Sequence, residues 1–314
     1  MMSGRFPHRI APLAAFFAIV LLASAPLASA QEIQGSFDRT LKVAGAVDLT
    51  IQSGSGQITV QPGAADSVRV VARLRSGGSW TASKTDIEQR IRKIEQNPPI
   101  TQQGGTIKIG FFEDSDLQRD ISISYDVTVP AGAKVAARSG SGGIVIGALK
   151  STVDVSTGSG SIQVDGAAGL KARTGSGSIK ASAIAGGATV STGSGRITMA
   201  QTGPGDVTAS SGSGSITLTG VSGAAKVSAA SGGITIDGRI TAPWSLNSSS
   251  GGVTVTLPPD AAFDVDAHCS SGSVSTTHPV TMTGEMDRRH IAGKVRGGGP
   301  LLKVTTSSGS IKIQ

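Results

Sequence analysis

A six-residue phrase, Ser/Thr-Gly-Ser-Gly-x-Ile, recurs along this chain and restricts its fold more than any other feature. Complete copies occupy Ser53–Ile58, Ser139–Ile144, Thr157–Ile162, Thr174–Ile179, Thr192–Ile197 and Ser211–Ile216. Shortened copies begin at Ser231, Ser250, Ser271 and Ser308. From Gly142 to Gly251 the last glycines of successive copies lie 17 to 19 residues apart. A fixed period of this length predicts a solenoid of stacked rungs.

Between the phrases, apolar and polar residues alternate as they do in a half-buried strand. Ser161-Ile162-Gln163-Val164 follows one phrase, and a second alternation, such as Val153-Asp154-Val155, precedes the next. Each rung is therefore expected to hold two short strands whose apolar residues stack from rung to rung. The first inward column comprises Ile144, Ile162, Ile179, Ile197, Ile216, Ile234, Val253, Val274 and Ile311. The second comprises Ile146, Val164, Ala181, Met199, Leu218, Ile236 and Val255. At ~4.8 Å per rung, roughly ten rungs give a rod of about 50 Å.

The phrase glycines are expected at corners between strands. Glycine suits a corner either because φ is positive there or because adjacent backbones crowd, and the sequence leaves both reasons open. No copy carries the lysine of a phosphate loop or the aspartate of a calcium-binding roll. The copies also open strands rather than the helix that a dinucleotide site needs. The phrases therefore predict architecture and no cofactor or metal site.

The period divides residues 31–314 into the parts of a single all-β solenoid domain. Residues 139–275 are the regular rungs, and residues 57–138 are an N-terminal insertion of strands and one helix. We interpret this insertion as a cap over the exposed end of the core, with a ligand-gripping lid as the alternative. Residues 276–300 read as an inserted hairpin loop, and residues 301–314 as the final rung.

One short helix is expected inside the N-terminal insertion. Thr85-Asp86-Ile87-Glu88 has the form of a capping box, and Ile87, Ile91 and Ile94 share one face at helical spacing. Asn97-Pro98-Pro99 is expected to end this helix.

The first thirty residues have the features of a signal peptide. Arg5 and Arg9 form a basic start, an apolar stretch runs from Leu13 to Ser24, and Ala28-Ser29-Ala30 fits the small-residue cleavage rule. The apolar stretch is shorter than the ~20 residues of a spanning helix. We therefore expect an exported chain, in the periplasm, at the cell surface or outside the cell, with no integral membrane segment after cleavage.

Charge and cysteine content exclude several classes of function. Loss of Arg5 and Arg9 lowers the net charge from +7 to +5, and only 3% of the residues are aromatic. A nucleic-acid surface combines basic and aromatic residues on one face, so no nucleic-acid partner is expected. Cys269 is the single cysteine, which forbids an internal disulfide and reads as a small buried residue.

The segment 263–269 holds the best candidate for chemistry. Asp264, Asp266 and His268 alternate and would share one face of a strand, a geometry that a metal or general-acid site could use. We interpret them as the outer face of a strand that buries the residues between them. His278 and His290 have no evident partners in sequence. No catalytic, cofactor-binding or metal-binding residues are assigned.

One outward column of the regular rungs holds the same residue on several consecutive rungs. Thr198, Thr217, Thr235 and Thr254 fall at one offset on consecutive rungs. Such a polar ladder suits either ordinary solvation of a sheet face or contact with a repetitive polymer.

The chain resembles the bacterial DUF4097 family, a group of adhesin candidates related to the head domains called GIN. The matching segments are Tyr125–Gly132 leading into Ser139–Gly142, the Thr-Gly-Ser-Gly repeats, Val255–Ala261 and Lys303–Ile311, which together span most of residues 36–314. The resemblance implies a right-handed parallel β-helix-like solenoid that is exported or displayed on the surface. It supplies no catalytic or binding residue.

Three functions are consistent with these features. We expect a non-catalytic envelope or surface protein, an adhesin or scaffold whose solenoid faces meet an envelope polysaccharide or another surface protein. The alternative is a periplasmic regulatory or assembly partner that acts through the N-terminal insertion. A polysaccharide-processing enzyme is the least favoured, because no set of acids and bases gathers at one rung offset.

Overall fold

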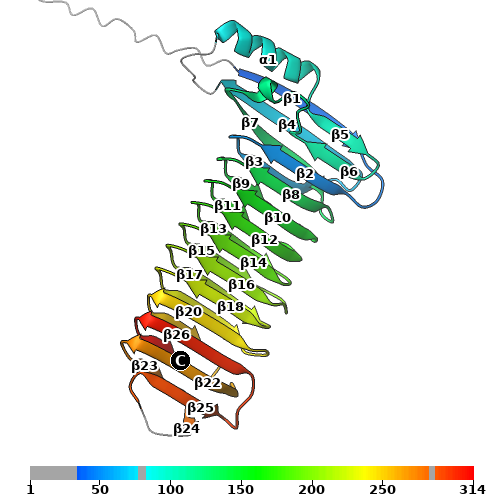
Figure 1. Ribbon diagram of the computed structural model, residues 1–314. Helices are drawn as coiled ribbons and strands as arrows, with labels where there is room; N and C mark the ends of the chain where they lie inside the picture. Colours follow the sequence, from blue (N-terminus) through cyan, green and yellow to red (C-terminus); the bar gives the residue numbers. More distant parts are fainter. Residues whose placement is uncertain (1–33, 77–82, 283–286) are drawn as a thin grey trace, which may run out of the picture. The chain divides into compact units, whose positions relative to one another are not determined.

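The computed structural model describes residues 34–76, 83–282 and 287–314, and the expected signal peptide lies outside them. Two sheets of 13 and 14 strands, named sheet A and sheet B, lie back to back, and apolar side chains of both fill the space between them (Figure 1). The predicted mostly-β solenoid with one α-helix is confirmed for these residues.

Ten rungs each contribute one strand to each sheet. In stacking order their sheet B strands are β2 (Asp48–Ser53), β8 (Lys134–Ser139), β10 (Thr152–Thr157), β12 (Gly169–Thr174), β14 (Ala188–Thr192), β16 (Val207–Ser211), β18 (Ala225–Ala229), β20 (Trp244–Ser250), β26 (Leu301–Ser308) and β22 (Phe263–Ser271). Their sheet A strands are β3 (Ile58–Gly63), β9 (Ile144–Ile146), β11 (Ile162–Val164), β13 (Ile179–Ile184), β15 (Ile197–Gln201), β17 (Ile216–Ser222), β19 (Ile234–Arg239), β21 (Val253–Thr256), β27 (Ile311–Ile313) and β23 (Val274–Thr276).

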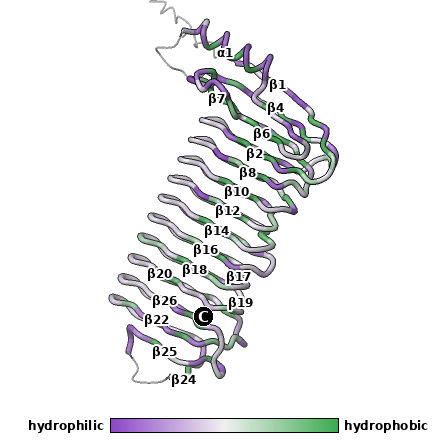
Figure 2. Tube along the Cα trace, turned by 45° about the vertical axis from the view of Figure 1, so that its right-hand side comes forward, coloured by the Kyte–Doolittle hydropathy of each residue, from purple (hydrophilic) through white to green (hydrophobic). Residues whose placement is uncertain are grey.

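The rungs stack in parallel and in register. Ile162 pairs with Ile144 on one side and with Ile179 on the other, and this pairing continues along the predicted inward column. Both inward columns are buried. Figure 2 shows the resulting alternation of hydrophobic and hydrophilic residues along the rungs. Each inward residue thus lies beside the residue at the same repeat position of the next rung.

Stacking order departs from chain order at the C-terminal end. Residues 301–314 are the last rung along the chain, yet β26 and β27 lie between β20/β21 and β22/β23. The first inward column therefore runs Val253, Ile311, Val274. The other edge of β22 pairs with antiparallel β25 (His290–Val295), which pairs with β24 (Val280–Met282). The period could not reveal this order, because every rung presents the same apolar column to its neighbour.

Strands of the N-terminal insertion that follow β3, together with β1, which precedes the first rung in the chain, extend both sheets beyond that rung. In sheet A, β7 (Ile121–Pro130) pairs in parallel with β3, and antiparallel β4 (Ser67–Ser76) and β1 (Gln34–Lys42) follow. In sheet B, β6 (Thr106–Ile109) pairs with β2, and β5 (Ile100–Gln103) closes the edge. Because β2 and β3 also pair directly with β8 and β9, the insertion leaves the stack of rungs unbroken.

Helix α1 (Lys84–Gln96) packs against β1, and a short 3₁₀ helix η1 (Ser115–Gln118) lies beside it (Figure 1). The buried face of α1 is Ile87, Ile91 and Ile94, as the sequence predicts. The capping-box prediction was wrong, because α1 begins after Ser83, whose side chain makes no capping bond. At the other end, the carboxylate of Glu95 accepts a hydrogen bond from the Ser36 amide at 2.7 Å. This contact satisfies one donor on the outermost strand of sheet A.

Candidate functional site

The corners of the rungs explain the glycines of the repeated phrase. A Cβ on Gly177 would lie 1.9 Å from the carbonyl oxygen of Gly160, and a Cβ on Gly195 would lie 2.1 Å from that of Gly177. Within the described residues, only Gly272 and Gly309 of the phrase glycines have φ in the left-handed region, at 132° and 157°. Crowding between stacked backbones is therefore the reason that applies to every copy.

The first residue of the phrase ties neighbouring corners together. The Thr174 hydroxyl donates to the carbonyl oxygen of Gly160, one rung earlier, at 2.8 Å and accepts from the Gly177 amide at 3.1 Å. Hydroxyls that donate in the same way to the preceding rung belong to Ser139, Thr157, Thr192, Ser211, Ser248 and Thr306. We call this buried column the hydroxyl ladder. Ala229 and Cys269 stand in the same column without a hydroxyl, and Cys269 is fully buried, as predicted.

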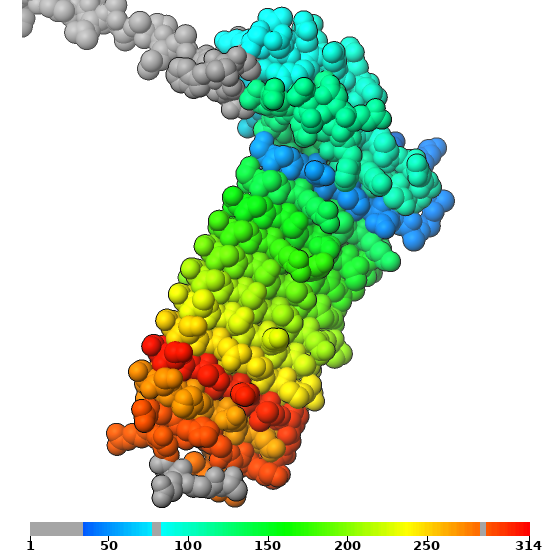
Figure 3. Space-filling model, viewed as in Figure 1, coloured from blue at the N-terminus to red at the C-terminus, as the bar shows by residue number. Residues whose placement is uncertain are grey.

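Each ladder hydroxyl is engaged by the preceding rung, and those of Ser139, Thr157 and Thr174 also accept a backbone amide. The phrase therefore builds the solenoid and leaves the outer faces for contact with partners. Figure 3 shows the rungs as successive rows across one face of the molecule. The side chains in these rows come from fixed positions of the repeat. The strand-pairing register therefore shows which outward residues are neighbours in each column.

Sheet A carries the predicted threonine column on its outer face. Thr198 pairs with Thr217, Thr217 with Thr235, and Thr235 with Thr254, on four neighbouring strands. We call these four residues the threonine ladder. Lys180 continues the column on β13, and Lys312 continues it on β27. From Lys180 to Lys312 the column spans about 24 Å, since neighbouring strands lie ~4.8 Å apart.

Sheet B gathers basic residues that are far apart in the chain. Arg138 on β8 and Arg173 on β12 both lie beside Ser156 on β10. Among the described residues, neither arginine has an ion pair. Lys171 pairs with Asp154 at 3.4 Å, and both side chains are about half exposed. Sequence reasoning missed this patch, although both arginines directly precede the first residue of a phrase.

Asp264, Asp266 and His268 lie on the outer face of β22, in agreement with the interpretation of the sequence. Phe263, Val265, Ala267 and Cys269 are buried behind it. The Asp264 carboxylate accepts a hydrogen bond from the Gly299 amide at 3.3 Å. The Asp266 carboxylate lies 3.1 Å from Nε2 of His290, and the rings of His268 and His290 lie edge to face with centroids 5.8 Å apart.

Both loop histidines have partners that the sequence did not indicate. His290 reaches Asp266 because β25 runs antiparallel to β22. His278 is buried, and its ring meets Phe263 edge to face at 5.5 Å. Across residues 34–76, 83–282 and 287–314, no three His, Cys, Asp or Glu side chains are arranged to hold a metal ion.

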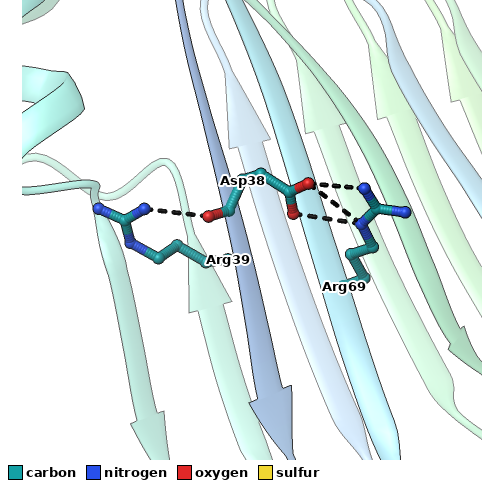
Figure 4. Close-up of polar contacts among 3 residues, drawn as sticks. All are labelled: Asp38, Arg39 and Arg69. Carbon is teal, nitrogen blue, oxygen red and sulfur yellow. Dashed lines mark hydrogen bonds and ion pairs between the residues drawn. The ribbon is translucent and has the colours of Figure 1, made fainter.

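Exposed ion pairs mark the N-terminal strands of sheet A. The Arg69 guanidinium donates to both carboxylate oxygens of Asp38 and forms an ion pair of 2.6 Å, while Arg39 donates to the Asp38 carbonyl oxygen at 2.9 Å (Figure 4). The hydrogen bond from Arg69 and its positive charge lower the pKa of Asp38 from its usual value. Such exposed pairs contribute little to stability. We assign these charges to keeping an outer strand soluble rather than to a binding site.

Comparison with solved structures finds chains of low identity and low structural similarity. The chain is similar to an adhesin candidate from Bacteroides fragilis, with 12% identity, a TM-score of 0.39, and coverage of 89% of this chain and 97% of the other. It is also similar to a cell adhesion candidate from Clostridium sporogenes, with 11% identity, a TM-score of 0.23, and coverage of 90% and 99%. A lipid-binding candidate from Parabacteroides distasonis gives 12% identity, a TM-score of 0.35, and coverage of 89% and 96%. Scores this low support no argument about ligands.

Three further observations concern curated relatives, membrane-spanning helices and family membership. No curated protein matches the chain. Within the described part of the chain, no helix has the length and apolar character needed to cross a membrane. The family model described as Toastrack DUF4097 matches residues 48–314. The chain therefore belongs to the Toastrack DUF4097 family.

Proposed function

We propose that this protein is a non-catalytic, exported protein of the cell envelope or cell surface, and that the outer face of sheet A binds an extended partner. Export is inferred from the basic start, apolar stretch and cleavage site in residues 1–30. An adhesin or a scaffold would use the face in this way.

The observation that carries the proposal is the threonine ladder. Four identical hydroxyl-bearing side chains occupy neighbouring strands in register, and each is exposed or half-buried. A polymer that lies across the strands meets the same side chain every ~4.8 Å. Repeated weak contacts on one chain add through effective concentration, so such a face binds a polymer far better than a single unit.

The hydroxyls of the repeated phrase support the non-catalytic part of the proposal, because they are buried and already hydrogen-bonded. The ladder residue Thr174 is 6% exposed and bonded on both sides. A serine or threonine nucleophile needs an adjacent base and access to substrate. The recurring Ser/Thr of the phrase instead stabilises the corners.

Cell fractionation and a matched pair of variants test the proposal. The mature chain is expected outside the inner membrane, without residues 1–30. Purified mature chain is expected to bind washed cells from which its gene has been deleted. The double substitution Thr217→Glu and Thr235→Glu should abolish this binding, because it places two bulky negative charges in the middle of the ladder. Thr189→Glu and Thr208→Glu, neighbours on the outer face of sheet B, serve as the control.

The outcomes separate the alternatives. Equal loss in both double variants, or no loss in either, would overturn the assignment to sheet A. Retention of the chain in the cytoplasm would overturn export. A chain that is confined to the periplasm and indifferent to both double variants would favour the regulatory or assembly role.

A further inference from the structure

A shallow hollow lies on the outer side of sheet A, at the end of the threonine ladder nearest β13. Its volume is about 560 Å³. The polar side chains that line it belong to Ser178, Lys180, Ser194, Arg196, Thr198, Ser213 and Ser215. We call it the Lys180–Arg196 hollow. It shares Thr198 with the threonine ladder, so the two features form one continuous surface.

Two cations stand at neighbouring repeat positions here. The position before the column isoleucine is serine in the neighbouring rungs, at Ser178 and Ser215, but is arginine at Arg196. The position after it is threonine from Thr198 to Thr254, lysine at Lys180 and glutamine one rung earlier, at Gln163. The Ile179 amide donates to the Arg196 carbonyl oxygen, so Lys180 and Arg196 lie on neighbouring rungs.

Neither cation has an acidic partner among the described residues. Nε of Arg196 donates to the Ser215 hydroxyl at 3.2 Å, which orients the guanidinium, and its other donors form no hydrogen bond or ion pair with this described part of the chain. Among the described residues, the ammonium group of Lys180 has neither a hydrogen bond nor an ion pair. No carboxylate lines the hollow. The nearby acid Asp165 is held by the Gln163 amide at 3.0 Å.

Two cations without an acidic partner, beside serine hydroxyls, suit an anionic ligand group. Guanidinium and ammonium groups bind carboxylates through charge-assisted hydrogen bonds, and hydroxyls add neutral donors around them. We propose that the Lys180–Arg196 hollow binds a carboxylate of an acidic polysaccharide whose neutral sugars lie along the threonine ladder. The inference rests on the proposed function in one respect, because it uses the same face of sheet A.

The spacing of charge along this face favours a polysaccharide in which neutral sugars separate the acidic ones. Cations stand at the two ends of the column, Lys180 and Lys312, about 24 Å apart, and threonines stand between them. A polymer with a charge on every unit would place most of its charges against neutral hydroxyls. A nucleic acid does not fit this face, because stacked bases need aromatic platforms and the described residues of the face include none.

Binding to gellan fragments, in which neutral sugars separate the uronates, tests the inference. Neutral dextran and densely charged polygalacturonate of similar length are the comparison probes. The mature chain should bind gellan fragments most tightly, with an affinity that falls as salt rises. Lys180→Gln with Arg196→Gln should weaken binding about tenfold, as expected for the loss of charge-assisted contacts. Arg138→Gln with Arg173→Gln removes the same charge from sheet B and should change affinity less than about twofold.

Each outcome decides the inference. Equal losses in the two double variants would show attraction to net charge alone and overturn the site. Tighter binding of polygalacturonate than of gellan fragments would overturn the sparse-charge partner. Absence of gellan binding would overturn the acidic polysaccharide, whereas the proposed function would survive if the Thr217 and Thr235 variants still lost binding to cells. The binding assay uses purified chain, so its result does not depend on where the chain resides.

Discussion

The regular rungs and the two ends of this solenoid are built by different forces. In the rungs, corner glycines approach the preceding rung closely, and the hydroxyl ladder joins one corner to the next. At the N-terminal end, antiparallel strands, the apolar face of α1 and exposed ion pairs take their place. The rungs therefore depend on the backbone at positions where only glycine fits, and the ends depend on side-chain packing. Substitutions of matched size in the two regions should separate these contributions.

The largest effect is expected at a corner glycine. Gly195→Ala places a Cβ 2.1 Å from the Gly177 carbonyl oxygen, so two stacked backbones must separate. We expect a loss of about 3 kcal/mol or more in the free energy of unfolding. Urea unfolding followed by circular dichroism measures it. Gly132→Ala is the control, since a Cβ there meets nothing within 4 Å. Equal midpoints for the two variants would remove crowding as the reason for the glycines.

The next effect is expected at the N-terminal end. Ile91 is buried on α1 and packs close to Gly35 of β1. Ile91→Ala should cost about 2 kcal/mol, the low end of the usual range, because α1 packs at the edge of the molecule and can settle towards β1. Hydrogen exchange should increase in α1 and β1, while the amides of β14 and β16 stay protected. Arg92→Ala, on the exposed face of the same helix, should leave exchange unchanged. Uniform deprotection of all rungs would mean that the two regions unfold as one unit.

A smaller effect is expected within the hydroxyl ladder. Thr174→Val keeps the shape of the side chain but removes its bonds to Gly160 and Gly177. Leaving these buried backbone groups without a partner should cost about 1–2 kcal/mol. The comparison is Thr189→Val, whose hydroxyl is on the exposed face of sheet B. A loss no greater than that of Thr189→Val would show that the ladder contributes nothing beyond packing.

The smallest effect is expected to be a gain. Ala229 occupies the hydroxyl ladder with a methyl group and is 4% exposed. Ala229→Ser should restore the bond to the preceding corner, at Gly214, and stabilise the chain by about 0.5–1 kcal/mol. A thermal melt against Ala230→Ser, its exposed neighbour, measures the difference. A lower melting temperature for Ala229→Ser would mean that this corner has closed around the methyl group.

Residues that obey the period were predictable from sequence, and those outside it were not. The inward columns and the threonine ladder follow from one offset in each rung, since parallel stacking in register places equal offsets side by side. The place of residues 301–314 within the stack did not follow, because any rung fits beside any other. The contact of His290 with Asp266 depends on an antiparallel pairing that carries no repeat.

The candidate site was predicted only in part, for the same reason. The threonine ladder was predicted, but its cationic end was missed because Lys180 and Arg196 look like ordinary departures from the repeat when they are read along the chain. When the rungs are compared position by position, Lys180 and Arg196 place two cations side by side on neighbouring rungs. Departures from a repeat that coincide in space are therefore the signal that sequence reading should have sought.

The central claim, that the outer face of sheet A meets the partner, is tested most directly by lysine acylation footprinting of the mature chain on washed cell envelopes. Lys180 and Lys312 bracket the threonine ladder, and Lys226 and Lys303 lie on the outer face of sheet B. All four side chains are exposed. Bound chain should show reduced acylation at Lys180 and Lys312, with Lys226 and Lys303 reacting as in free chain. Protection of Lys226 and Lys303 with unchanged reaction at Lys180 and Lys312 would contradict the claim.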